Sequence, residues 1–543
     1  MSADHVTIGG PPSATDPQPQ EARHVEVFDT TLRDGSQLEG ISLTVDDKLR
    51  IAEQLDWLGV HYIEGGWPGA NPKDDEFFRR VHSELQLDTS TLVAFGSTRR
   101  KAGKVDSDDT LRHLLEANTG TVCIVGKTWD YHVTAALETT LDEGVAMVAD
   151  SVEFLRGEGR EVLFDAEHFF DGYKRNPEFG LRVLEGAVEK GASTLVLCDT
   201  NGGSLPHEVE QIVADVVRYF GTDVRIGVHT HDDTGCGVAN ALAGVRGGAT
   251  HVQGTVNGYG ERTGNCNLTT VIANLALKMG VATIAADRME RLTPVSHHVA
   301  ELVNMPLNPQ QPYVGTSAFA HKAGLHVSAI VRRPDAYEHV PPDTVGNGTR
   351  FVVSELAGKS TLQLKAKELG LELDGPTLSE VVDTLKRLEH EGYHFEAADG
   401  SLELLLRRAG GWEHDFFRME SFRVITDEIG DRAFTTEATV KVHVGGERKV
   451  ATAEGNGPVN ALDRALRLAI GTRFPVLERI HLTDYKVRVL DTAKGTGAIT
   501  RVLIDSTDGE RSWSTIGVSD NIIEASWQAL CDSIVFGLLH NAG

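Results

Sequence analysis

The stretch VRIGVHTH, residues 224–231, decides the fold. It is a short run rich in β-branched residues that ends in polar side chains, which is typical of a buried parallel strand. His229 and His231 are two residues apart, so on a strand both imidazoles point to the same side. We therefore expect a strand whose carboxyl end offers two nitrogen atoms to a single ligand.

Seven more runs of this kind accompany it along the chain. Segments with helical periodicity separate them, and the first of these begins at Thr44 with Asp47 three residues on, a pattern typical of a capping box. Each run is short, rich in Val, Ile or Leu, and ends in polar or glycine residues. The seven runs are HVEVFDT from 24, VHYIEGG from 60, TLVAFGS from 91, TVCIVGK from 121, EVLFDAE from 161, TLVLCDT from 194 and THVQGTVN from 250.

This alternation predicts a (β/α)8 TIM barrel over residues 24–305. Eight consecutive strand–helix repeats fit a closed barrel better than an open doubly wound sheet. The first helix is also not opened by a GxGxxG pattern, which counts against a dinucleotide-binding fold. Residues 1–23, rich in Pro, Gln, Ser and Ala, are predicted to be a disordered tail.

The rest of the chain predicts two further regions. Residues 306–410 read as a mostly helical linker region. From residue 415 the composition becomes strand-rich, and three strand-like runs precede a helix at 458–471. Three more such runs precede a second helix at 521–540, so residues 415–543 are predicted to form an α+β domain with a duplicated βββα unit. A plain dimerisation domain is one interpretation of it.

The composition restricts the function. The 543 residues carry a formal net charge of −27, which argues against a nucleic-acid partner. An anionic substrate must then be captured by local positive charge, from an arginine or a metal. Five scattered cysteines, no secretory signal and no apolar run of roughly 18 residues predict a soluble, cytoplasmic protein without a membrane partner.

Four side chains at the ends of the predicted strands form a candidate metal site. Asp34 follows the first run, His229 and His231 end the seventh, and Asn265 follows the eighth. Strands seven, eight and one are neighbours in a closed barrel, so these groups can meet at its active-site face. The two histidines alone could equally well form hydrogen bonds at a polar rim of the barrel. The added carboxylate and amide favour the binding of one divalent metal ion. Mixed nitrogen and oxygen ligands leave Mn, Mg, Zn and Co open.

Three motifs carry a family resemblance over essentially the whole chain after residue 23. DTTLRDGSQ (29–37), HTHDDTG (229–235) and GYGERTGN (258–265) resemble the signature set of the metal-dependent acyl-CoA-condensing barrels. These are the 2-isopropylmalate, homocitrate and citramalate synthases, with hydroxymethylglutaryl-CoA lyase as a relative. The resemblance implies an acyltransferase that joins acetyl-CoA to a 2-oxo acid, with the metal held by the four ligands predicted above.

The resemblance also implies roles for further residues. Arg33 would neutralise the 2-oxo oxygen as negative charge develops, and Thr200 would bind the substrate carboxylate. Glu167, in FDAEHFFDGY, resembles the carboxylate that assists enolisation of acetyl-CoA. His326, in FAHKAGLHVSAI, resembles a histidine that is presented to the neighbouring subunit's active site, with His321 as the alternative. A structural polar residue is the other interpretation of each.

The loop before Asn265 separates a synthase from a lyase. It carries Glu261 and Arg262 where the lyase would place a catalytic cysteine, which favours a synthase. The stretch EGGWPGANPKDDEFF (64–78) resembles the citramalate synthases, which implies pyruvate as the 2-oxo acid, as do PPDTVGN from 341 and RFVVSELAGKS from 350. The alternatives are a 2-isopropylmalate synthase, which uses 2-oxoisovalerate, and a non-catalytic amino-acid-sensing regulator.

Several expectations depend on this resemblance. Trp67 and Val125 are candidates for the pocket that selects pyruvate, with core packing as the other interpretation. The isopropylmalate enzymes typically show a loop tyrosine where this chain has Thr349-Arg350-Phe351, and Tyr337 or water would fill its role. Residues 306–410 would complete the active site of a partner in a homodimer. Residues 415–543 would be an allosteric domain, and because citramalate leads to isoleucine without threonine, its inhibitor would be isoleucine.

Overall fold

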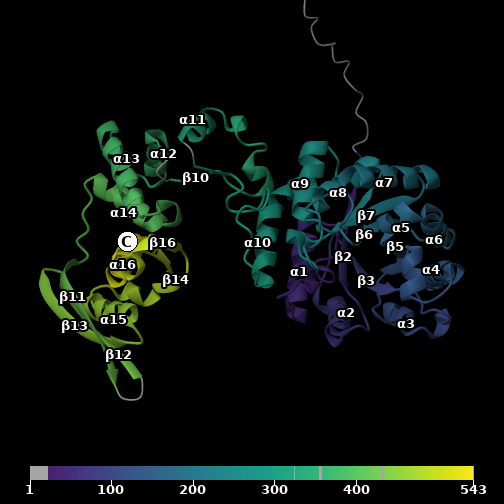
Figure 1. The fold of residues 1–543 in the computed structure, drawn as a ribbon, viewed down its shortest axis with the longest axis horizontal. Coiled ribbons are helices and arrows are strands. Elements are labelled where there is room, and N and C mark those ends of the chain that lie inside the picture. Colours follow the sequence, from purple (N-terminus) through teal and green to yellow (C-terminus); the bar gives the residue numbers. More distant parts are fainter. Residues whose placement is uncertain (1–22, 323, 354–357, 430–432, 542–543) are drawn as a thin grey trace, which may run out of the picture. The chain divides into compact units, whose positions relative to one another are not determined.

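A computed structural model describes residues 23–322, 324–353, 358–429 and 433–541 (Figure 1). The predicted disordered tail lies outside the described residues except for Arg23. The chain forms two compact units, of which the first is Met1–Phe319 together with Val340–Gly348. The second is Ala320–His339 together with Thr349–Gly543. The boundaries expected at residues 305 and 410 stay predictions.

Eight parallel strands close into a barrel in sequence order, which confirms the predicted fold. Strand β1 pairs with β2 on one side and with β8 on the other, so β7, β8 and β1 are neighbours at the point of closure. The strands are Glu26–Asp29 (β1), Tyr62–Gly66 (β2), Thr91–Ser97 (β3), Thr121–Lys127 (β4), Glu161–Glu167 (β5), Thr194–Asp199 (β6), Arg225–Thr230 (β7) and His251–Gly254 (β8).

Helices follow the strands and surround the barrel (Figure 1). At the first helix, Thr44 accepts a hydrogen bond from the backbone of Asp47 and the Asp47 carboxylate accepts one from Thr44, which confirms the predicted capping box. The helices of this unit are Val45–Leu58 (α1), Pro72–Glu84 (α2), Asp109–Glu116 (α3), Leu141–Gly157 (α4), Phe169–Arg175 (α5), Pro177–Glu189 (α6), Pro206–Phe220 (α7), Gly237–Gly247 (α8), Leu268–Met279 (α9) and Leu292–Leu302 (α10).

Two apolar layers hold the barrel together. One lies between the strands and the helices, where Ile51, Leu55 and Val213 are fully buried. The other fills the inside of the barrel and includes Phe28 and Leu163. Because the interior is packed, functional side chains at the strand ends stand on a rigid floor rather than over a channel.

The segment Val340–Gly348 returns to the barrel unit after the chain has left it. Val345 is fully buried there, and its carbonyl accepts a hydrogen bond from the Thr293 hydroxyl (2.6 Å). Gly346 has a φ of 72°, and a Cβ at this residue would lie 1.9 Å from the Glu290 carbonyl oxygen. The stretch PPDTVGN therefore requires its glycine to dock against the barrel unit.

The second unit contains a helical region followed by two βββα units, as predicted. Each βββα unit is an antiparallel sheet, in the orders β11-β12-β13 and β14-β15-β16, followed by a helix. The elements are Ala320–His321 (β9), Gly324–Arg332 (α11), Arg350–Phe351 (β10), Lys359–Glu368 (α12), Gly375–His390 (α13), Asp399–Ala409 (α14), Arg418–Ile429 (β11), Ala433–Val444 (β12), Glu447–Gly455 (β13), Pro458–Ile470 (α15), His481–Val489 (β14), Thr500–Thr507 (β15), Ser512–Ser519 (β16) and Ile522–Asn541 (α16).

Helix α16 is long and apolar enough, by length and composition, to cross a membrane. Most of its apolar stretch is nevertheless buried inside the unit, where α16 packs against β15 and β16. Its Ser533 hydroxyl also bonds Ser506 (2.7 Å) and accepts from the Trp513 indole (3.2 Å). These contacts are those of a core helix. The cytoplasmic location stays a prediction.

Candidate metal centre

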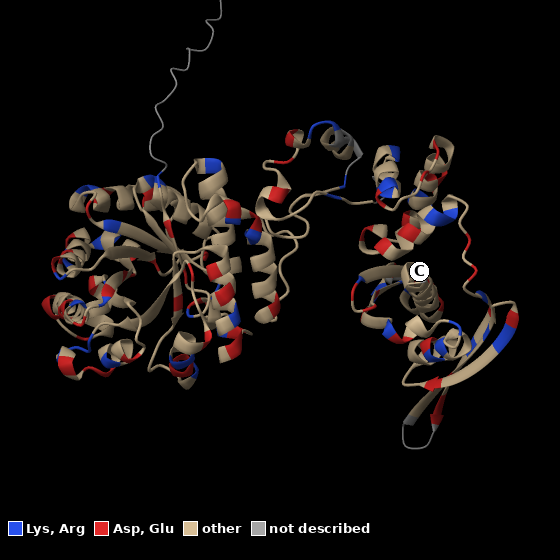
Figure 2. Cartoon of the chain, turned by 180° about the vertical axis from the view of Figure 1, so that it is seen from behind, with Lys and Arg blue, Asp and Glu red and all other residues tan. Residues whose placement is uncertain are grey.

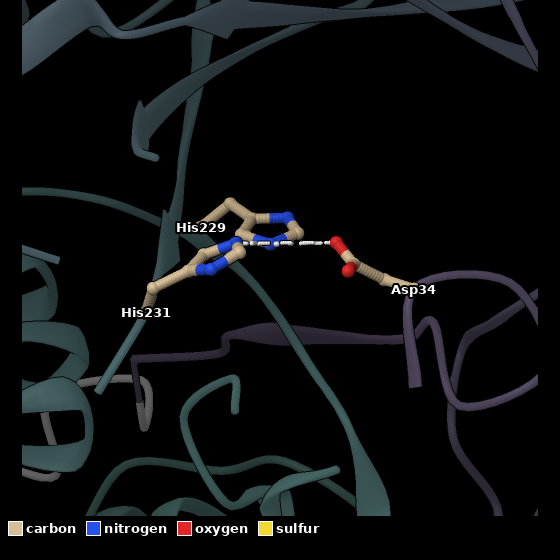
Figure 3. Close-up of side chains that lie close together, drawn as sticks. All are labelled: Asp34, His229 and His231. Atoms are coloured by element: carbon tan, nitrogen blue, oxygen red, sulfur yellow. Dashed lines mark hydrogen bonds and ion pairs between the residues drawn. The ribbon is translucent and has the colours of Figure 1, made fainter. Parts of the chain in front are cut away.

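Three predicted ligands converge at the carboxyl end of the barrel (Figure 3). His229 lies in β7, His231 follows it, and Asp34 approaches from the loop after β1. The two Nε2 atoms are 3.2 Å apart, and Asp34 Oδ2 lies 3.5 Å from that of His229 and 3.9 Å from that of His231. All three side chains are buried. The strand register therefore brings together the groups that the sequence placed at strand ends.

Asn265, the fourth predicted ligand, lies beside this group. Its Oδ1 lies 2.8 Å from Nε2 of His229. Its amide nitrogen donates to the Tyr259 carbonyl (3.1 Å), which turns the amide oxygen toward the histidines. Two nitrogens and two oxygens thus face a common point.

The orientation of His229 is set by a buried hydrogen-bonded chain that the sequence did not reveal. Nδ1 of His229 lies 2.7 Å from Oε1 of Gln253, and the Gln253 amide nitrogen donates to Asp165 (3.0 Å). Because the amide nitrogen faces Asp165, its oxygen accepts from His229, so the imidazole proton is on Nδ1. Nε2 then faces the ligand group, and a histidine held through Nδ1 in this way is typical of metal-bound histidines.

His231 has a different environment. Burial, together with neighbouring His229, lowers the pKa of His231 to about 4, so the ring is neutral at pH 7. Its Nδ1 lies 3.1 Å from Nη2 of Arg262, which can only donate. The proton of His231 is therefore on Nε2, directed at His229. A cation bound through Nε2 would displace that proton, and the contact with Arg262 would then have to open.

Arg33 lies beside the ligands, with 11% of its side chain exposed. Its guanidinium bonds Glu64 (2.6 Å), lies 3.1 Å from Asp34 and covers the ring of Phe95 at 3.8 Å. Burial alone would lower the pKa of Arg33, but the charges of Glu64 and Asp34 raise it above its ordinary value. Conversely, burial would raise the pKa of Asp34, but Arg33 and the two histidines lower it. The site therefore holds a permanent cation against a carboxylate that stays ionised.

A second buried group of possible ligands lies in the same barrel. Glu64, Cys123 and Asp165 also bring a ligand atom each within 4.8 Å of one another. Burial and the nearby Asp165 charge raise the pKa of the Cys123 thiol well above its ordinary value. A protonated thiol is a poor metal ligand, and Glu64 already pairs with Arg33. Only the first group has the properties of a cation site.

The first group fits a divalent cation. Neighbouring ligands of an octahedral ion with bonds near 2.1 Å lie about 3 Å apart, and the separations within the group are 2.8 to 3.9 Å. Imidazole, carboxylate and amide oxygen suit Zn, Mn, Co or Mg. The chemistry of the donors, rather than their mere proximity, makes this the candidate metal centre.

A cavity of about 660 Å³ opens from the metal ligands. Arg33, Asp34, His229 and His231 line it, together with Glu167 and Thr200 from the ends of β5 and β6. Its wall also includes the two residues proposed for pyruvate selection, Trp67 and Val125, whose role stays a prediction. The described structure thus places most of the predicted site residues around one space.

Two of these residues already have partners within the chain. The Glu167 carboxylate forms an ion pair with Lys127 at the end of β4, and both side chains are partly exposed to the cavity. The Thr200 hydroxyl accepts a hydrogen bond from the backbone of His168 (2.9 Å). Their roles in catalysis stay predictions.

His326 belongs to the second unit. It lies exposed in α11, and its ring stacks on that of Tyr337 with centroids 4.4 Å apart. The alternative, His321, is partly buried, and its Nε2 lies 3.4 Å from Glu338. The predicted contribution of His326 to the active site of a partner subunit stays a prediction.

Comparison with known proteins agrees with this geometry. The family described as HMGL-like matches residues 24–296, and the homocitrate synthase post-HMGL domain-like family matches 313–393. The LeuA allosteric (dimerisation) domain matches 396–537. The chain is 51% identical to the (R)-citramalate synthase of Aquifex aeolicus over 95% of this chain and 98% of that protein.

The chain belongs to the (R)-citramalate synthase family. It is 53% identical to the family member of Streptomyces coelicolor, over 94% of this chain and 96% of that protein. A probable 2-isopropylmalate synthase of Methanopyrus kandleri is more distant, at 34% identity over 93% of this chain and 96% of that protein. The chain is therefore an acyl-CoA-condensing acyltransferase, and its HMGL-like barrel is of a divalent-metal-dependent family. The alternative interpretation, a non-catalytic regulator that senses amino acids, is therefore not supported.

Several residues of the site were missed by the sequence analysis. Gln253 was assigned only to a strand, Glu64 only to a strand end, and Lys127 to no role. A polar residue inside an otherwise apolar barrel strand is the signal that could have found Gln253, because a buried amide needs partners. The pairing of Lys127 with Glu167 depends on the register of β4 and β5, which no motif indicates.

Proposed function

We propose that this chain condenses acetyl-CoA with pyruvate and water to give citramalate and CoA. The observation that carries the proposal is 51% identity to an (R)-citramalate synthase over 95% of the chain. The reaction needs a base to remove a methyl proton of the thioester and a stabilised oxyanion at the ketone. Groups suited to both tasks line one cavity.

The ketone end would be held by the ligand group. Asp34, His229, His231 and Asn265 would bind the divalent cation, which as a Lewis acid polarises the 2-oxo group. Arg33 is largely shielded from solvent and permanently charged, so it would stabilise the negative charge that develops on the ketone oxygen. Its bond to Glu64 holds it in place, so the site does not need to reorganise during the reaction.

Thr200 and Glu167 would act on the two substrates from neighbouring strands. Thr200 would donate its hydroxyl to the pyruvate carboxylate, because its oxygen lone pair is used by the His168 amide while its proton is available. Glu167 would take the methyl proton of acetyl-CoA. Lys127 orients the Glu167 carboxylate and has to release it for that step. His326 of a partner subunit would complete the site.

An assay of CoA thiol release with a panel of 2-oxo acids tests the substrate assignment. We expect release with pyruvate at a kcat/KM at least tenfold above that with 2-oxoisovalerate, since a hydrophobic pocket discriminates a few methylenes by about 1–3 kcal/mol. A preference for 2-oxoisovalerate would establish the 2-isopropylmalate alternative instead. Repeating the assay after chelation and addition of Mn, Mg, Zn or Co identifies the metal that supports turnover.

We also propose that the second unit forms a homodimer and binds isoleucine as an inhibitor. The support is the LeuA allosteric (dimerisation) match and a cavity of about 380 Å³ between α15 and α16. Apolar side chains such as Leu482 and Ile534 line it beside polar ones such as Asn460 and Tyr485. Titration calorimetry of the full chain with isoleucine and leucine tests this, and the absence of isoleucine binding would contradict it.

A further inference from the structure

The cavity of the barrel is much larger than pyruvate requires. Its volume of about 660 Å³ is that of a site for a ligand of cofactor size. One part is lined by the metal ligands and another by the apolar side chains of Leu137, Met147 and Val148. Arg100 and Lys101, in the loop after β3, also line it. The cavity therefore joins an ionic centre, an apolar wall and a basic edge.

The basic edge belongs to the segment TRRKAGK, residues 98–104. We call Arg99–Lys104 the basic loop, because it carries four cations in a chain of net charge −27. Figure 2 shows acidic residues spread over the helices of the barrel. In such a chain, a cluster of four cations beside a cavity is a candidate site for an anionic ligand.

One cation of the loop is structural. Arg99 is buried and bonds Glu143 and Asp150 of α4, both at 2.7 Å, while its backbone donates to the Ser151 hydroxyl (2.9 Å). The charge of Arg99 is therefore compensated within the protein. These contacts attach the loop firmly to α4, so its other side chains start from a fixed backbone.

The remaining cations are not compensated in this way. Within the described ranges, no carboxylate lies within ion-pair distance of the side chains of Arg100 or Lys104, and the Arg100 side chain is exposed. Lys101 contacts the carbonyls of Leu137 and Glu138, at 2.6 and 3.4 Å, and lies 3.9 Å from the Glu138 carboxylate. The backbone of the loop is thus fixed, while most of the positive charge of its side chains at the rim of the cavity has no carboxylate partner.

We infer that Arg100 and Lys101, assisted by Lys104, bind the phosphates of the 3′-phospho-ADP end of coenzyme A. The inference rests on the proposed use of acetyl-CoA. The thioester must reach Glu167, and the pantetheine arm would follow the apolar wall, leaving the polyanionic nucleotide outside at the basic loop. A guanidinium and an ammonium are the groups that bind phosphate oxygens most strongly among neutral-pH side chains.

Direct binding tests the inference without using the reaction. Adenosine 3′,5′-bisphosphate is titrated into the full chain by calorimetry, with the wild type, Arg100→Gln and the double variant Arg100→Gln/Lys101→Gln. We expect a weakening of about tenfold for the single variant and more for the double variant, since each removes a charge-assisted hydrogen bond. Binding by the wild type should weaken with added salt. An unchanged affinity in both variants would overturn the inference.

A matched control removes two charges from another face of the barrel. Arg182 on α6 and Lys190 just after it are partly exposed, pair with Asp142 and Glu153 respectively, and do not line the cavity. The double variant Arg182→Gln/Lys190→Gln should leave the affinity for the bisphosphate unchanged. An equal weakening in this control would show a general field effect and would overturn the assignment to the basic loop.

Kinetics with a truncated substrate separate the nucleotide end from the thioester end. In Arg100→Gln, the KM for acetyl-CoA should rise about tenfold, while that for pyruvate and the kinetics with acetyl-pantetheine should stay unchanged. An equal rise with acetyl-pantetheine would overturn the inference. If no 2-oxo acid supports CoA release, the proposed function fails, and the calorimetry still decides this inference.

Discussion

Two groups of buried side chains in one barrel differ in what they can do. Asp34, His229 and His231 lie within reach of one cation, and so do the ligand atoms of the group that contains Glu64 and Cys123. The first group faces the cavity, and Gln253 holds Nδ1 of His229 so that Nε2 points at the other ligands. The second carries a protonated thiol and a carboxylate already paired with Arg33.

The difference shows that proximity of ligand atoms does not define a metal site. What matters is the partner on the far side of each ligand. Gln253 turns Nε2 of His229 toward the other ligands, whereas Oε2 of Glu64 is held by Arg33 and Thr30. The second group therefore supports the first, through Arg33 and through the chain from Asp165 to Gln253.

The largest expected effect comes from the first group. His229→Ala removes a buried ligand that contacts both Asn265 and Asp34, so we expect loss of both metal binding and turnover by at least about a thousandfold. Metal content after dialysis and CoA release measure the two. Retained activity would contradict the ligand assignment.

A smaller effect is expected at the chain that orients His229. Gln253→Met keeps the length of the side chain but removes the oxygen that accepts from Nδ1, so metal affinity should fall about 10–100-fold. Gln253→Glu retains the oxygen that accepts from Nδ1 but loses the donor to Asp165, so its affinity should lie between that of Gln253→Met and that of the wild type. Calorimetric titration with Mn or Zn measures both, and equal affinities for Met and Glu would show that the acceptor is irrelevant.

The variant Glu64→Gln should show that the second group affects turnover without contributing a metal ligand. The variant keeps the shape but removes the charge that holds Arg33, so kcat should fall by about tenfold or more. Metal affinity should change by less than about threefold, because Glu64 is not a ligand. A loss of metal as large as in His229→Ala would place Glu64 in the metal site.

Cys123→Ala should have the smallest effect. The thiol is fully buried with a pKa well above its ordinary value, so at pH 7 it neither binds a metal nor reacts as a thiolate. We expect unchanged metal affinity and a loss of about 1 kcal/mol in the free energy of unfolding from the small cavity created. Chemical denaturation measures the stability. Weaker metal binding in this variant would indicate that the second group does bind a metal ion.

Much of this fold and part of this site could be predicted from the sequence. The eight apolar runs became the eight strands because a parallel barrel strand is buried on both faces and reads as a continuous apolar run. His229, Asp34 and Asn265 could be brought together because closure makes β7, β8 and β1 neighbours. The order of the strands in the barrel was sufficient to predict that these side chains lie close together.

The rest depends on side-chain directions that strand order does not give. The bond between Gln253 and His229 requires the rotamers of both and the register of β7 against β8. The pairing of Lys127 with Glu167 requires adjacent residues on β4 and β5 to lean toward each other. Neither leaves a spacing pattern along the chain, because the partners are far apart in sequence.

The return of Val340–Gly348 to the barrel unit has a consequence for how the protein can be divided. The chain crosses between its units after residues 319, 339 and 348, so the catalytic unit is not one continuous stretch of sequence. A truncation after Phe319 would remove Val345 from the place where it is fully buried. A fragment meant to retain the intact barrel unit must extend to Gly348, and it will carry Ala320–His339, with helix α11, as an insertion.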